Sequence, residues 1–96
     1  MILSFEQVAV SNAVLTAAAN LTIPNNCLWA ELQATAGNIR YTMDDTTNPT
    51  IASGMLLVAN EVPKLFLVED LNRIRFIRDG AGDATLELHY GAHRNV

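Results

Sequence analysis

Few side chains in this sequence are of the kinds that bind metal ions or perform catalysis. His89 and His93 are its only histidines, and on a helix their spacing would place both on one face, as a metal site requires. The residues around His89 alternate like a strand, however. We therefore expect His89 on a polar strand face and His93 in a flexible tail at 91–96, both as surface residues rather than ligands.

Carboxylates and hydroxyls provide no clearer reaction centre. Asp44 and Asp45 precede hydroxyl and amide side chains at 46–48, whose oxygens suit a hard cation such as calcium. Adjacent carboxylates on an extended chain point in opposite directions, and the spacing is not that of a known calcium loop. The serines lack a neighbouring histidine and acid, and no nucleophile-elbow glycine pattern surrounds them. We expect a non-enzymatic protein with no catalytic residue, metal or cofactor.

The amino-acid composition argues against two further classes of partner, nucleic acids and membranes. The net charge is -4 with only six Lys and Arg, which argues against nucleic-acid binding. Arg73, Arg75 and Arg78 cluster, but we expect Arg73 and Arg75 to share a solvated or salt-bridged strand face. The first residues lack the positive segment of a signal peptide, and no apolar run approaches the roughly 20 residues that cross a bilayer. We expect synthesis in the cytosol and no membrane partner.

The elements that would carry these residues are short strands bounded by Asn, Pro, Gly or Asp. A chain of 96 residues is expected to form one domain, 1–96. The sequence predicts strands at 4–10, 27–35, 39–43, 54–58, 64–68, 73–78 and 84–90, and favours strand over helix for the alanine-rich segment 13–19. These segments predict an all-β fold, an antiparallel β-sandwich or jelly roll of about seven or eight short strands.

Alternation assigns faces within these strands. In segment 27–35, Leu28 and the even-numbered residues that follow it are predicted to face the core. Cys27 and Trp29 are predicted to lie on the other face. Separately, the lone Cys27 is expected to be a buried thiol. The turn at 36–38 predicts a hairpin that makes 27–35 and 39–43 antiparallel neighbours.

The remaining assignments concern the last strand and the longest loop. In the last strand, Leu86 and Leu88 are predicted to face the core, with Thr85 and Glu87 on the polar face. The polar segment 44–53 is expected to be a surface loop, because its short side chains hydrogen-bond to local backbone.

Half of the residues are hydrophobic, which is a high fraction for so short a chain. A small domain buries only part of its apolar surface, so we expect a homo-oligomer, with a trimer favoured. Trp29 is more typical of a subunit contact than of a sugar platform, because carbohydrate sites usually need several exposed aromatic residues.

The chain contains the segments IRYT at 39–42, NPTIASGMLL at 48–57, IRFI at 74–77 and ATLELHY at 84–90. Together these segments resemble small β-sandwich virion proteins of tailed bacteriophages and prophages. The similarity covers residues 27–90, and residues 1–26 form an N-terminal strand or arm region outside it. The resemblance implies a capsid decoration or cement protein, or alternatively a tail or fibre module that binds a host glycan, for instance through loop 44–53.

For a decoration protein, the resemblance implies the capsid surface of the virion as location and the major capsid protein as partner. We expect such a protein to stabilise the head shell by binding without catalysis. Apolar residues near the N-terminus would then provide an arm, or equally an ordinary edge strand. The interface candidates are Ile2, Leu3, Phe5 and Trp29.

Overall fold

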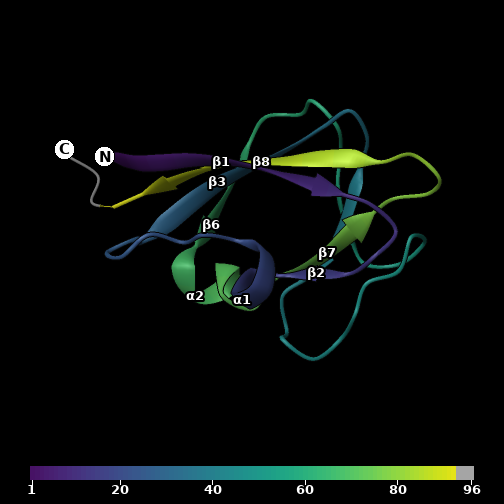
Figure 1. Cartoon of the computed structure of the whole chain (residues 1–96), viewed down its shortest axis with the longest axis horizontal. Coiled ribbons are helices and arrows are strands. Elements are labelled where there is room, and N and C mark those ends of the chain that lie inside the picture. The colour runs from purple at the N-terminus through teal and green to yellow at the C-terminus, as the bar shows by residue number, and fades with distance from the viewer. Residues whose placement is uncertain (93–96) are drawn as a thin grey trace.

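The computed structural model describes residues 1–92 and shows two four-stranded antiparallel sheets packed against each other (Figure 1). Sheet 1 has the strand order β1-β8-β3-β6, and sheet 2 has the order β2-β7-β4-β5. The elements are β1 (Ile2–Val10), β2 (Leu15–Thr16), α1 (Ala17–Asn20), β3 (Trp29–Thr35), β4 (Ile39–Thr42), β5 (Met55–Leu57), β6 (Lys64–Leu67), α2 (Val68–Leu71), β7 (Arg75–Arg78) and β8 (Ala84–Gly91). The predicted all-β sandwich is confirmed.

The core lies between the sheets and follows the alternation of each strand. On β8, Leu86 and Leu88 are buried with Ala84 and Tyr90, as predicted. Sheet 2 contributes Ile39, Tyr41, Leu57 and Phe76 from the opposite side. The rings of Tyr41 on β4 and Phe66 on β6 lie 5.5 Å apart, so an aromatic contact joins the two sheets.

The predicted hairpin between segments 27–35 and 39–43 is wrong. β3 pairs with β6 and β8, whereas β4 pairs with β5 and β7, so the chain crosses from one sheet to the other at 36–38. Ala36 takes a left-handed conformation there (φ 65°), and the Asn38 side chain accepts a hydrogen bond from the Ala59 amide at 2.7 Å. A turn between two alternating segments is compatible with a hairpin inside one sheet and with a crossing between two sheets. Both connections place the apolar residues of the two segments in one core.

The start of the third predicted strand is also corrected. Cys27 is a buried free thiol as expected, but Leu28, predicted to face the core, is 44% exposed. β3 begins only at Trp29. Residues 27 and 28 therefore precede the strand, and its alternation does not apply to them. From Ala30 onward the predicted core face is confirmed.

The alanine-rich segment 13–19 forms more helix than strand, contrary to prediction. Only Leu15 and Thr16 pair with β7, and the short helix α1 follows. The Thr16 hydroxyl accepts from the Ala19 amide, while the Asn20 side chain accepts from the Thr16 amide. These reciprocal caps and the high helix propensity of alanine explain the helix. At the start of α1, the Ala17 amide donates to the carbonyl of Ile74, which lies between α2 and β7.

The surface loop 44–53 is held against sheet 2. The Arg75 guanidinium donates to the Asn48 side chain and to the Asp45 carbonyl, both at 2.7 Å. Arg40 donates to the Gly54 carbonyl at 3.0 Å. Arg73 does not share a strand face with Arg75 as predicted, because β7 begins only at Arg75. The loop is thus anchored at both ends by arginines of the sheet.

The first ten residues are an edge strand rather than an arm. β1 pairs along its length with β8, and the Ala92 amide donates to the Met1 carbonyl at 2.9 Å. Gly91 and Ala92, which the sequence placed in the tail, are buried. His93 and the rest of the predicted tail lie outside the described residues.

Candidate interaction face

The surface that gathers the predicted interface residues is the side of sheet 1 that points away from the core. We call it the outer face. The strand registers place on it Ile2, Phe5 and Gln7 from β1, Glu87, His89 and Gly91 from β8, Trp29, Glu31 and Gln33 from β3, and Leu65 and Leu67 from β6. These residues alternate with core residues on every strand, which is why one flat surface carries them all.

At one end of the outer face, an apolar row crosses all four strands. Gly91 lies between Ile2 and Trp29, and Leu67 lies beyond Trp29. A Cβ on Gly91 would overlap the indole ring of Trp29, so the ring lies across the β8 backbone at a position that only glycine allows. The indole nitrogen donates to the Ala92 carbonyl. The Trp29 side chain therefore connects β3 to the end of β8. In the same row, the side chains of Ile2 and Leu67 are more than half exposed.

The next row combines apolar and ionisable side chains. Phe5, His89, Glu31 and Leu65 lie opposite one another on successive strands. The rings of Phe5 and His89 have centroids 5.0 Å apart and are tilted by 52°. Phe5 is 50% exposed and Leu65 is 56% exposed. His89 is on the polar face of its strand, as the sequence predicts.

Leu3 differs from the other three interface candidates. The register between β1 and β8 shifts between Ile2 and Ser4, which makes Leu3 an extra residue in β1. Its side chain is half-buried and packs against the core. The structure therefore brings Ile2, Phe5 and Trp29 together on the outer face and directs Leu3 elsewhere.

Polar side chains in the middle of the outer face hold one another in place. The Glu87 carboxylate accepts a hydrogen bond from the Thr35 hydroxyl at 2.7 Å and one from the Gln7 amide at 3.5 Å. The Gln33 amide donates to the Glu61 carbonyl at 3.0 Å. These bonds connect β1, β8 and β3 and fix the direction of the Glu87 and Gln33 side chains.

Comparison of the chain with protein-family models, with curated proteins and with solved structures gave no match. The function must therefore be inferred from the fold and the surface of this chain. An exposed sheet face with apolar side chains and ordered polar groups suits binding to another molecule.

Of the side chains considered for metal binding, Asp44 is engaged in hydrogen bonds of its own turn. Asp44 accepts hydrogen bonds from the Thr47 hydroxyl at 2.6 Å and from the amides of Thr47 and Thr46, and these bonds lower the pKa of Asp44 to about 2. The carboxylate thus closes its own turn. Within residues 1–92, no group of three or more His, Cys, Asp or Glu could hold a metal ion.

Residues 1–92 contain no helix with the length and apolar character needed to span a membrane.

Sequence reasoning missed most of the outer face. Glu87 and His89 were recognised only as polar positions of the last strand, and Leu65 and Leu67 were not singled out. Their grouping depends on the pairing of β8 with both β1 and β3. Alternation indicates which residues face outward, but it does not indicate which strands are neighbours.

Proposed function

We propose that this chain is a bacteriophage virion structural protein of the decoration or cement type, which binds the major capsid protein on the outside of the head and stabilises the shell without catalysis. The class follows from the resemblance of residues 27–90 to small β-sandwich virion proteins. The confirmed sandwich fold is the architecture which that resemblance implies.

The observation that carries the proposal is the concentration of exposed apolar side chains on the outer face. Ile2 and Leu67 at one end and Phe5 and Leu65 in the next row are each at least half exposed. Singly exposed apolar residues are normal, but several on one flat face mark an interaction surface. Attachment to a preassembled shell requires a rigid surface of this kind and no reacting group.

The edge strand β1 adds a second means of attachment. Among residues 1–92, β1 is paired with β8 alone, so its other side offers backbone groups to an extended segment of a partner. Ile2 and Phe5 lie on this same strand. Strand addition at β1 would therefore continue the apolar surface of the outer face into the partner.

The test compares particles with and without the protein. We expect particles that carry it to retain their genomes at higher temperature and after low-salt washing. Equal retention by both sets, with labelled protein located only at the tail, would overturn the proposal in favour of the tail or fibre module.

Variants show whether the outer face is the contact. We expect Leu67→Glu to abolish binding to the shell, because it places a charge in the apolar row. Val62→Glu is the matched control, because Val62 is 86% exposed but lies between β5 and β6, outside the outer face. Equal binding by both variants would exclude the outer face.

A further inference from the structure

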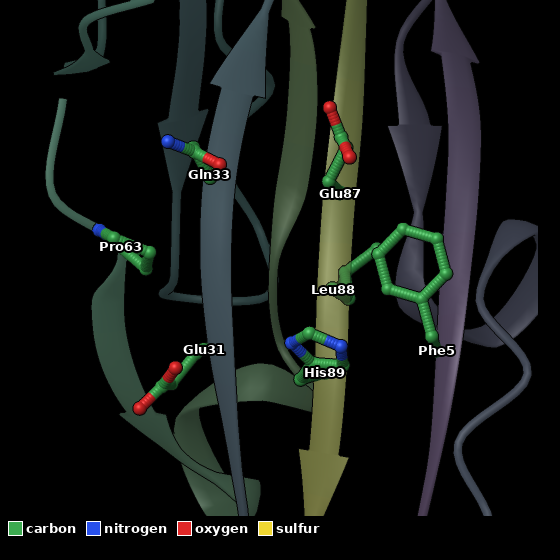
Figure 2. Close-up of a pocket in the computed structure, with 7 residues that line it drawn as sticks. All are labelled: Phe5, Glu31, Gln33, Pro63, Glu87, Leu88 and His89. Atoms are coloured by element: carbon green, nitrogen blue, oxygen red, sulfur yellow. The ribbon is translucent and has the colours of Figure 1, made fainter. Parts of the chain in front are cut away.

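Sheet 1 has a second free edge, which is formed by β6. Among residues 1–92, β6 is paired with β3 alone. Figure 2 shows the outer face around a shallow hollow, with Pro63, the residue before β6, at the margin of the sheet on the far side of β3 from β8. β6 has only four residues, whereas the edge strand β1 has nine. A strand that pairs with β6 must therefore fit a short stretch of backbone.

A pocket of about 420 Å³ runs along this edge. All four residues of β6 line it, together with Tyr41, Met43 and Asp70. Tyr41 is buried, yet its hydroxyl makes no hydrogen bond within residues 1–92. The enclosed side-chain atoms that lack a partner in this range belong to arginines, so the hydroxyl is not enclosed and opens into the pocket. Apolar walls with a hydroxyl and a carboxylate suit a side chain that has a long apolar stem and a polar end.

The backbone of β6 sets the register of an added strand. The Val68 amide donates to the Leu28 carbonyl on the β3 side at 3.0 Å. Because backbone groups alternate in direction along a strand, the amide of Leu67 and both backbone groups of Leu65 point away from β3. Two antiparallel copies of β6 would exchange hydrogen bonds when the Leu67 amide of each copy donates to the Leu65 carbonyl of the other.

The apolar side chains match in this register. Leu65 and Leu67 lie on the outer face and are each more than half exposed. Each Leu65 would lie opposite Leu67 of the other copy, and such cross-strand apolar pairs stabilise a sheet. The contact is self-complementary, because the same pair occurs twice about a two-fold axis.

The charged side chains match as well. Lys64 would lie opposite Val68 of the other copy, the first residue of α2, where Asp70 lines the pocket two residues further on. Within residues 1–92, neither the Lys64 nor the Asp70 side chain makes a hydrogen bond or an ion pair. Opposite charges would therefore meet at both ends of the paired strands, without breaking a bond that the single chain contains.

Other strands match β6 less well. An edge lysine hinders pairing with a strand that offers no acid, and Pro63 has no amide hydrogen with which to extend the pairing beyond Lys64. The long edge strand β1 contains no Lys or Arg that would pair with Asp70. The side-chain pattern of β6 and α2 thus favours a second copy of β6 over β1.

We propose that β6 of one copy pairs with β6 of a second copy about a two-fold axis, and that the Lys64 side chain of each copy enters the pocket of the other and forms an ion pair with Asp70. Two four-stranded sheets would then form one continuous sheet and join their outer faces. The contact does not depend on the proposed function, because it leaves β1 free for another partner.

Charge exchange tests this contact by sedimentation. Lys64→Asp places an acid at both positions, and Asp70→Lys places a cation at both. Each variant alone should weaken the dimer by about tenfold or more, because like charges then meet, whereas an equimolar mixture of the two should restore it. Glu69→Lys is the matched control for Asp70→Lys, because Glu69 is its exposed neighbour on α2 and does not line the pocket. This control should dimerise like the wild type.

Several sedimentation results would overturn the proposal. One is a dimer of unchanged strength in both variants, and another is a mixture that remains as weak as its components. A wild type that is monomeric would also overturn it. So would a trimer, which composition alone favours, because a ring of three copies has no two-fold axis.

Hydrogen exchange locates the contact independently of its strength. The Leu67 amide should exchange more slowly in the wild-type dimer than in Lys64→Asp, because only the dimer provides a hydrogen-bond acceptor for it. The Leu88 amide, in the centre of sheet 1, should exchange equally in both proteins. Equal exchange of the Leu67 amide would show that the copies associate through another surface.

Discussion

The Tyr90 hydroxyl donates a hydrogen bond to the Glu6 carboxylate at 2.6 Å, which joins two residues 84 positions apart in the chain. Tyr90 is fully buried on β8, and the same Glu6 oxygen also accepts from the Thr22 amide at 3.0 Å. The Glu6 carboxylate on β1 is thus bonded to β8 through Tyr90 and to the segment after α1 through Thr22.

Removing the hydroxyl should weaken this connection. We expect Tyr90→Phe to lower the free energy of unfolding by about 1.5 to 3 kcal/mol, the usual contribution of a hydrogen bond to a charged group. Tyr41→Phe is the matched control, because Tyr41 is also buried but its hydroxyl makes no hydrogen bond within residues 1–92. Urea denaturation measures both, and equal losses would show that the Tyr90–Glu6 bond contributes nothing specific.

Alkaline pH provides a second measurement of the same pair. Burial, and then the hydrogen bond and the charge of Glu6, raise the pKa of Tyr90 above its usual range. The unfolded chain ionises first, near pH 10, so this contribution is complete below that pH and is lost as the pH rises towards the folded pKa. We expect the denaturation midpoint of the wild type to fall more steeply above pH 10 than that of Tyr90→Phe. Parallel curves would contradict this.

Gly91 should tolerate no side chain while Trp29 lies across it. We expect Gly91→Ala to destabilise the fold by about 1 to 3 kcal/mol through overpacking. Gly82→Ala should change stability little, because a Cβ there meets no atom within 4 Å. In combination with Trp29→Ala, the cost of Gly91→Ala should be much smaller than in the wild type. Additive effects would mean that the indole does not set the requirement for glycine.

Strand β8 allows a comparison of its two faces. Leu86→Ala and Leu88→Ala should each cost about 2 to 5 kcal/mol, because both side chains are fully buried. Thr85→Ala and Glu87→Ala should cost far less, although each side chain is partly covered. A denaturant titration that gave equal losses at all four positions would contradict this assignment of faces.

Oligomer formation can be measured by sedimentation. The 50% hydrophobic content of so short a chain, taken alone, leads us to expect a homo-oligomer, with a trimer favoured, at micromolar concentration. A monomer alone at these concentrations would refute the expectation.

The positions of the strands could be predicted from the sequence better than which strands pair with one another. Leu86 and Leu88 alternate with polar residues, and this local pattern survives folding because burial on one face requires it. The position of Leu28 could not be predicted, because alternation does not tell where a strand begins. The crossing at 36–38 could not be distinguished from a hairpin, since Ala34 and Ile39 face one core in either arrangement.

The outer face was the least predictable feature for a similar reason. Phe5, His89 and Glu31 lie in one row only because β8 enters between β1 and β3. Each residue occupies an outward position in its own strand, and that much is visible in the sequence. Their proximity depends on long-range pairing, about which a single sequence contains no direct signal.

The late position of β8 in the chain affects how the protein is made. Every pair of neighbouring strands in sheet 1 is separated in sequence by at least one other strand, and β8 is the central partner of both β1 and β3. On the ribosome, β1 and β3 would emerge long before β8 and would expose unpaired edges until β8 is also available. Sheet 1 therefore cannot form before β8 is made, and its folding should be slow because it requires closure of large loops. Nascent chains stalled before residue 84 would depend on chaperones to avoid aggregation.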